Sequence, residues 1–164
     1  MNGKLRNMTA IYLLKGDKVL LLYRQGGKVV NNVWTGSAGG HFEKDELNDA
    51  KSCVIREMRE ELGLQPEDLE ELAFRYVTLR STQGEIRQNY YFFAELKESV
   101  DENLSSNEGQ CQWFSLDEIT SLKMNSAIRE VATISKLFNN DTLAEFDLLI
   151  PIINKMGATI SSTT

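Results

Sequence analysis

The sequence predicts a fold of the α/β (α+β) class, in which a mixed β-sheet is covered by helices. Two observations predict this class. Strand-like runs and helical patterns follow one another in the order strand, strand, helix, several strands, helices, and neither an internal repeat nor a linker divides them. The 164 residues have the length of one domain, so we expect a single domain over 1–164. A chain of this size buries about two-thirds of its unfolded surface without needing a disulfide or a structural metal.

The first half of the chain predicts a hairpin, a loop and a helix. Residues 9–14 and 18–23 are apolar, strand-like runs joined by a short turn that contains glycine, which predicts a β-hairpin. Residues 26–40 are rich in Gly and Asn and indicate a segment that is mostly loop. From Asn48 to Leu62 apolar residues recur every four positions, and Gly63 follows where a helix ends.

The second half predicts further strands and then helices. We expect strands at 72–79, 86–96 and 110–114, with a turn at 81–84. Ser115 and Glu118 have the spacing of a capping box, which predicts the start of a helix. Residues 126–138 and 142–156 have helical patterns, although Pro151 interrupts the second, and we expect 157–164 to be a frayed tail. The apolar stretch 143–153 fits either a helix that closes the domain or the contact of a homodimer.

Composition excludes several classes of protein. The chain has 24 acidic and 18 basic residues and a net charge of −6, which argues against a nucleic-acid polymer as the partner. Cys53 and Cys111 lie far apart, so we expect no disulfide framework or zinc site and a reducing compartment. The apolar stretches are too short for a membrane span and the start lacks a signal-peptide pattern, so the expected location is the cytoplasm.

The acidic excess is local. Residues 43–71 contain 11 acids and 4 bases, and on a helix Glu57, Glu60 and Glu61 share one face that borders the apolar stripe. Partly buried like charges repel unless a cation lies among them, and hard carboxylate oxygens suit Mg²⁺ or Mn²⁺. An ordinary solvated helix face, with Arg56 and Glu60 as an i,i+4 pair, explains the same residues, so the helix alone does not decide between the two.

The context of the helix favours the metal site. From Gly40 to Leu64 the chain resembles the Nudix box, G-x5-E-x7-R-E-U-x-E-E-x-G-U, in which U is aliphatic. Nine fixed positions are filled, namely Gly40, Glu46, Arg56, Glu57, Met58, Glu60, Glu61, Gly63 and Leu64. The chain departs from the pattern between Glu46 and Arg56, where nine residues stand instead of seven, and at Asp45, where glycine is frequent. We expect a longer loop before an undisturbed carboxylate face, with the structural role of Glu46 in doubt.

The resemblance implies a fold, an activity and roles for residues. Nudix proteins have an α/β/α sandwich fold, and most hydrolyse a nucleoside diphosphate linked to another group, X, with divalent cations. By position, Glu57, Glu60 and Glu61 are implied to be the metal-binding and catalytic carboxylates, with Mg²⁺ as the expected ion and Mn²⁺ as its substitute. The carbonyl oxygen of Gly39 matches a backbone metal ligand of the family, and Arg56 is implied to orient the carboxylates.

A second resemblance concerns the residues outside the box. The loop 107–110 resembles one in MutT-type members, in which a glutamate completes the metal site or acts as general base, and Glu108 occupies that place; a solvated loop glutamate is the alternative. This subgroup implies a small-molecule substrate, a nucleoside triphosphate cleaved to the monophosphate and pyrophosphate, with an oxidised purine such as 8-oxo-dGTP as the expected example. The candidate substrate contacts are Arg24, Gly40, His41, Tyr90 and Trp113, with Tyr23, Trp34 and Phe92 as further aromatic side chains.

Each candidate has a structural alternative. Core packing explains any one of these aromatic side chains better than a contact to the base, and a structural or phosphate-facing role explains His41 better than a catalytic one. Cys53 fits a small packed thiol better than a nucleophile. Two other classes of function compete with hydrolysis: a Nudix-type module that binds a nucleotide without cleaving it, and an interaction protein whose acidic face is only solvated. Binding modules usually lack some of the box carboxylates, and this chain keeps all three.

Overall fold

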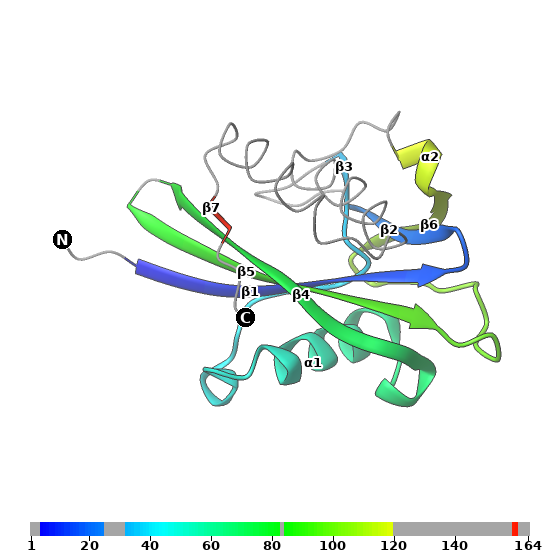
Figure 1. Cartoon of the computed structure of the whole chain (residues 1–164), viewed down its shortest axis with the longest axis horizontal. Coiled ribbons are helices and arrows are strands. Elements are labelled where there is room, and N and C mark those ends of the chain that lie inside the picture. Colours follow the sequence, from blue (N-terminus) through cyan, green and yellow to red (C-terminus); the bar gives the residue numbers. More distant parts are fainter. Residues whose placement is uncertain (1–3, 25–31, 83, 120–158, 161–164) are drawn as a thin grey trace.

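The fold is a mixed seven-stranded sheet with a helix packed on one face (Figure 1). The computed structural model describes residues 4–24, 32–82, 84–119 and 159–160. The strands are β1 (Lys4–Lys15), β2 (Lys18–Arg24), β3 (Val33–Thr35), β4 (Leu69–Thr82), β5 (Glu85–Leu96), β6 (Gly109–Ser115) and β7 (Thr159–Ile160). The helices are α1 (Ala50–Leu62) and α2 (Leu116–Ile119), and the 3₁₀ turns are η1 (Lys44–Glu46) and η2 (Pro66–Asp68).

Strand pairing makes the sheet mixed, which confirms the predicted fold class. The strand order is β3-β2-β1-β5-β4-β7, with β6 paired to β2. β1 runs parallel to β5 over eleven residue pairs, and the other pairings are antiparallel. The predicted hairpins β1–β2 and β4–β5 are both present. β1 begins five residues earlier than its apolar run because its polar first residues pair with the long β5.

Two segments differ from their predictions. Within 26–40, expected to be mostly loop, Val33–Thr35 forms β3 and satisfies backbone groups of β2. In the expected frayed tail, Thr159 and Ile160 form β7 and pair with Leu79 and Thr78 of β4. Neither short strand has an alternating apolar pattern that could reveal it. The helices expected at 126–138 and 142–156, and with them the apolar stretch 143–153, lie outside the described residues.

Helix α1 confirms the predicted helix and has a defined cap at each end. The Asp49 carboxylate accepts the Ser52 backbone N–H (3.0 Å), and Gly63 ends the helix in the left-handed conformation with φ 71°. Val54, Met58 and Leu62 are buried against the sheet. Burial of each such side chain contributes about 1.5–3 kcal/mol, so this face fixes the rotation of the helix and directs its carboxylates towards the loop before it.

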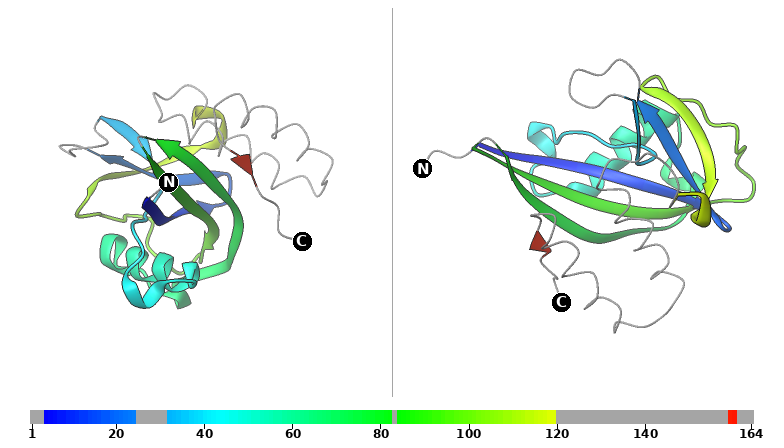
Figure 2. Two further views of the ribbon diagram at one scale, coloured as in Figure 1. Left: turned by 90° about the vertical axis from the view of Figure 1, so that its left-hand side faces the viewer. Right: turned by 90° about the horizontal axis from the view of Figure 1, so that it is seen from above.

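The two faces of the sheet have different cores. On the α1 side, buried aliphatic side chains such as Leu13 and Leu20 pack with Phe92 and the helix. On the other side is an aromatic ladder, in which Tyr76 stacks on Tyr91 at 4.5 Å between ring centroids and Tyr12 on Phe93 at 5.3 Å. Figure 2 shows α1 on one side of the sheet only. None of the helices in the described part of the chain is long and apolar enough to cross a membrane.

Candidate active site

The candidate site begins with a glycine loop that is held against β1. The Thr9 N–H donates to the Gly40 carbonyl (2.8 Å) and the Ile11 N–H to the Ala38 carbonyl (2.9 Å), so the loop runs beside the strand. A Cβ at Gly39, where φ is 149°, would collide with the Thr9 carbonyl oxygen, and a Cβ at Gly40 would collide with the Glu57 carboxylate. Only glycine permits this close approach of loop, strand and helix.

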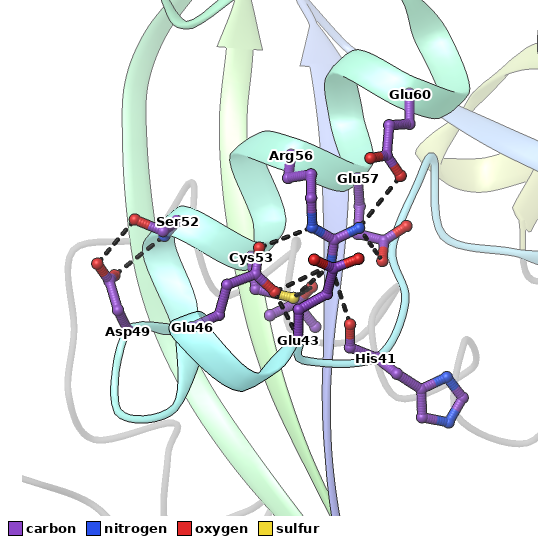
Figure 3. A network of polar contacts seen from close by, with 10 residues as sticks. His41, Glu43, Glu46, Asp49, Ser52, Cys53, Arg56, Glu57 and Glu60 are labelled. Atoms are coloured by element: carbon purple, nitrogen blue, oxygen red, sulfur yellow. Dashed lines mark hydrogen bonds and ion pairs between the residues drawn. The ribbon is translucent and has the colours of Figure 1, made fainter.

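Arg56 is the centre of the polar network between loop and helix (Figure 3). Its Nε and Nη2 donate to the two carboxylate oxygens of Glu46 at 2.7 and 2.9 Å. Its Nη1 lies 2.9 Å from Glu57 Oε1 and 3.1 Å from Glu60 Oε2, and Nη2 also donates to the His41 carbonyl (3.0 Å). Such two-pronged pairing gives geometric specificity as well as energy, and one guanidinium contacts the carboxylates of Glu46, Glu57 and Glu60; that it orients them stays a prediction.

Glu46 keeps a structural role in spite of the insertion. Its side chain is 8% exposed, and the hydrogen bonds from Arg56 lower its pKa to about 2 against the opposing effect of burial. Between Glu46 and α1 the chain passes through Asn48, which takes a positive φ of 73°. The loop thus lengthens while Glu46 stays in the network, and the doubt about its structural role was misplaced.

The three helix glutamates occupy different environments. The Glu57 side chain is only 12% exposed, and burial raises its pKa. Glu61 accepts the Gly39 N–H at 3.0 Å; burial raises its pKa to about 7, and the negative charges of Glu57 and Glu108 act in the same direction. Glu60 is 57% exposed. Two of the three predicted carboxylates are therefore half-buried near one another, and the third is exposed.

Glu108 lies beside this pair of carboxylates, and Arg24 is bonded to it. The Arg24 Nη2 atom is 2.5 Å from Glu108 Oε2. The pairing of β2 with β6 produces this contact, because Arg24 is the register partner of Gly109. Both side chains act on Glu61, whose pKa is lowered by Arg24 and raised by Glu108. Two residues 84 positions apart in the sequence thus meet at the same site.

The donor set fits a hard divalent cation. Glu57 and Glu61 supply carboxylate oxygens, and burial raises the pKa of both, so a cation would stabilise their ionised forms. In the part of the chain that the structure describes, no three His, Cys, Asp or Glu side chains converge on one point. Glu57 and Glu60 are paired with Arg56, and Glu108 with Arg24, so these three would have to change partners to share an ion with Glu61.

Three predicted substrate contacts have defined surroundings in the structure. The His41 ring points away from Glu57 (Figure 3), and its pKa is lowered by burial and then by Arg6 and Arg87. Tyr90 packs between Phe42 and Phe74. Trp113 rests on the core with its indole N–H donating to a backbone carbonyl. Of the further aromatic side chains, Phe92 is buried in the core, and Trp34 packs with Tyr23 and Phe114.

One site residue was missed by the sequence analysis. Cys111, a free thiol on β6, has a pKa that is raised by burial and further by the charge of Glu61. No local pattern offered a signal, because Cys111 reaches the site through the pairing of β6 with β2, in which its register partner is Leu22. The other thiol, Cys53, is buried on α1 and contacts the Thr9 hydroxyl at 3.3 Å, as a packed thiol does.

Comparison with known proteins agrees with this geometry. The model of the NUDIX domain family matches residues 4–133. No curated protein is similar enough in sequence to count as a relative.

Solved structures show the same fold. The Escherichia coli ORF135 protein has 23% identity and a TM-score of 0.64, with 87% of this chain and 96% of that chain covered. A MutT protein from Bacillus halodurans has 23% identity, 78% and 80% coverage and a TM-score of 0.57. A Caenorhabditis elegans Ap4A hydrolase has 19% identity, 84% and 99% coverage and a TM-score of 0.65. With the family match over most of its length, the chain belongs to the Nudix family of hydrolases, which act on pyrophosphate bonds.

Proposed function

We propose that this hydrolase is a Mg²⁺-dependent nucleoside-triphosphate pyrophosphohydrolase, which releases the monophosphate and pyrophosphate. One observation carries the proposal: Glu57 and Glu61 are half-buried near one another, beside a glycine loop, with raised pKa values. Such an arrangement is unfavourable for the free protein but suited to a site whose ligand is a divalent cation. Purine nucleotides, and oxidised ones such as 8-oxo-dGTP, are the proposed substrates.

The side chains have separate proposed tasks. Glu57, Glu60, Glu61 and Glu108, with the Gly39 carbonyl oxygen, are the proposed ligands of Mg²⁺ or Mn²⁺. The bound cation neutralises the phosphate oxygens and makes water a better nucleophile.

Three more residues take part. Arg56 fixes the orientation of Glu57 and Glu60 through its bonds at 2.9 and 3.1 Å. Arg24 is the proposed contact to a substrate phosphate, because its guanidinium reaches the edge of the carboxylate site from β2. Glu61 accepts the Gly39 N–H at 3.0 Å, so it also holds the glycine loop against the helix.

The substrate panel follows from the solved structures of similar fold. They include proteins named MutT and one named Ap4A hydrolase, so the panel should contain ordinary and oxidised nucleoside triphosphates, a nucleoside diphosphate sugar and diadenosine tetraphosphate. We expect Mg²⁺-dependent release of pyrophosphate from at least one nucleoside triphosphate. Both cysteines are free thiols, which supports the proposal that the protein works in the cytoplasm.

Matched variants test the role of the carboxylates. Glu57→Gln and Glu61→Gln should each lower kcat by at least about a hundredfold, because each removes a proposed ligand of the cation. Glu70→Gln, an exposed acid on β4, is the control for the loss of one negative charge and should retain activity. Binding of nucleotide without turnover of any panel member would identify a binding module instead. Turnover that is equal in Glu61→Gln and the unmodified protein would contradict the proposal.

A further inference from the structure

One ion pair joins two residues that have different proposed tasks at the site. Arg24 Nη2 lies 2.5 Å from Glu108 Oε2, and within the described part of the chain neither side chain forms an ion pair with any other residue. Arg24 is the proposed contact to a substrate phosphate, and Glu108 is a proposed ligand of the cation. While the Arg24–Glu108 pair is intact, neither side chain is free for its task.

The Arg24–Glu108 pair lies on the face of the sheet that carries α1. Leu20 of β2 is buried in the same core as Val54 of α1. Arg24 is four residues further along β2 and therefore points to the same face. The charges of Arg24 and Glu108 both act on Glu61. The two side chains and Glu61 therefore belong to one site.

The backbone is held on both sides of the pair, and the side chains are not. Arg24 is the register partner of Val33 in β3 and of Gly109 in β6. The Glu108 N–H donates to the Ser106 hydroxyl at 3.1 Å. The Arg24 and Glu108 side chains, by contrast, are 34% and 45% exposed. The pair can therefore open by rotation of the two side chains, without a change in the strands.

Opening the pair would release both side chains at once. Resting on the proposed function, we propose that the Arg24–Glu108 pair couples the binding of the cation to that of the substrate. Whichever ligand binds first opens the pair, and the second ligand then meets a side chain that is already free. The two ligands therefore favour each other's binding through the protein, and by the same factor. For partly exposed side chains this factor is about two- to fivefold in affinity.

The first test uses Mn²⁺ alone and the nucleotide-free protein, with binding measured by electron paramagnetic resonance at a fixed pH. Arg24→Gln removes the partner of Glu108 and should tighten Mn²⁺ binding about two- to fivefold. The loss of a positive charge alone would act in the same direction, so the double variant decides. In a Glu108→Gln background, Arg24→Gln should change the Mn²⁺ affinity little. The same tightening in both backgrounds would overturn the proposal.

The second test uses inorganic tripolyphosphate and the metal-free protein, with binding measured by calorimetry. Glu108→Gln frees Arg24 and should tighten the binding about two- to fivefold, but it should have little effect in an Arg24→Gln background. Glu102→Gln is the matched control, because Glu102 pairs with Lys15 at 3.4 Å, beside the end of β2 that is opposite to Arg24. This control should change neither the Mn²⁺ nor the tripolyphosphate affinity. An effect as large as that of Glu108→Gln would contradict the proposal.

The outcomes separate this coupling from the proposed function. If no nucleotide is hydrolysed but the effects of the two substitutions depend on each other in both tests, the proposed function fails and the coupling stands. If nucleotides are hydrolysed but the two effects simply add, the coupling fails and the proposed function stands. Dependence in only one of the tests would also contradict the coupling, because one ion pair must act on both ligands alike.

Discussion

At the scale of single residues, the bond between Glu46 and Arg56 holds the site together. Glu46 is nearly buried, and both its oxygens accept hydrogen bonds from Arg56, which in turn contacts Glu57 and Glu60. The loop before α1 is therefore tied to the carboxylate face through one guanidinium. A change at Glu46 should reach the site even though Glu46 is not a proposed ligand of the cation.

Glu46→Gln should lower both stability and activity. Gln keeps the shape but loses the charge opposite Arg56, and breaking a buried pair costs about 3–5 kcal/mol. We expect a loss near the lower end of that range in urea unfolding, and a lower kcat because Arg56 no longer fixes Glu57. Glu70→Gln is again the control. A variant as stable and active as the unmodified protein would show that Arg56 is positioned by other contacts.

The Glu46–Arg56 pair also predicts how the stability of the protein changes at low pH. The pKa of Glu46 is about 2 in the folded protein and about 4.5 when unfolded. Because the folded value is lowered, the stabilisation is fully present above pH 4.5 and is lost as the pH falls towards 2. Unfolding measurements between pH 5 and pH 3 should show a steep loss of stability, and Glu46→Gln should make the loss shallower.

Gly40→Ala should damage the site through packing rather than charge. The new Cβ would collide with the Glu57 carboxylate, so Glu57 must leave its position between the loop and Arg56. We expect kcat to fall at least about tenfold and stability to fall by about 1–3 kcal/mol. Gly16→Ala, in the β1–β2 turn, is the control variant. A Cβ at Gly16 would meet no other atom, but the positive φ of 59° strains alanine. This variant should therefore lose stability and keep kcat.

The residues of the box could be predicted because their spacing is local. Helical periodicity placed Glu57 and Glu61 on one face, and in the structure both are half-buried and contact the glycine loop. The contact between Arg24 and Glu108 could not be predicted in this way. It depends on the register of β2 with β6, and no local pattern encodes a register between strands so far apart.

At the scale of elements, α1 was the easiest to predict and β3 and β7 the hardest. The helix has a four-residue apolar repeat and defined caps, which are signals within one segment. β3 and β7 are three and two residues long, too short for an alternating pattern, and each exists because a neighbouring strand supplies its partners. The early start of β1 has the same cause.

The C-terminal cap of α1 can be tested separately from the chemistry. Gly63 has φ 71° and open space around it, so Gly63→Ala adds the strain of the left-handed conformation without a collision. We expect a loss of about 1 kcal/mol in the free energy of unfolding, and a smaller loss in Gly63→Asn because Asn tolerates this conformation. Both variants should keep kcat at low temperature. A large loss of kcat would show that the last turn, with Glu60 and Glu61, depends on this cap.

At the scale of the whole molecule, the net charge of −6 conceals two regions of opposite sign. Residues 43–71, which include α1, contain 11 acids and 4 bases, whereas Lys4, Arg6 and Arg87 gather around Glu85 at the start of β1. The acidic region attracts cations and the basic group attracts anions. The two regions lie on opposite faces of β1, because Thr9 contacts Cys53 on α1 and Arg6 has the other parity along the strand.

This division of charge predicts that the metal-free protein loses stability as the pH rises. Glu61 has a pKa of about 7 in the folded protein against about 4.5 unfolded, and the pKa of Glu57 is raised as well. Because the pKa of Glu61 is higher in the folded protein, the folded state binds more protons than the unfolded state between pH 4.5 and pH 7. The free energy of unfolding therefore falls as the pH rises through this range. For Glu61 alone, the loss is up to about 3 kcal/mol.

Magnesium should reverse this loss, because a bound cation takes the place of the proton on the buried carboxylates. We therefore expect Mg²⁺ to raise Tm by several degrees at pH 8 and by much less at pH 5, at roughly 2–4 °C for each kcal/mol. Glu61→Gln should be more stable than the unmodified protein at pH 8 without metal and should gain little from Mg²⁺. Thermal unfolding of both proteins at the two pH values measures this. An equal rise in Tm at pH 5 and pH 8, or an undiminished rise in Glu61→Gln, would show that Mg²⁺ binds elsewhere, and the destabilising burial of Glu61 would then need another explanation than catalysis.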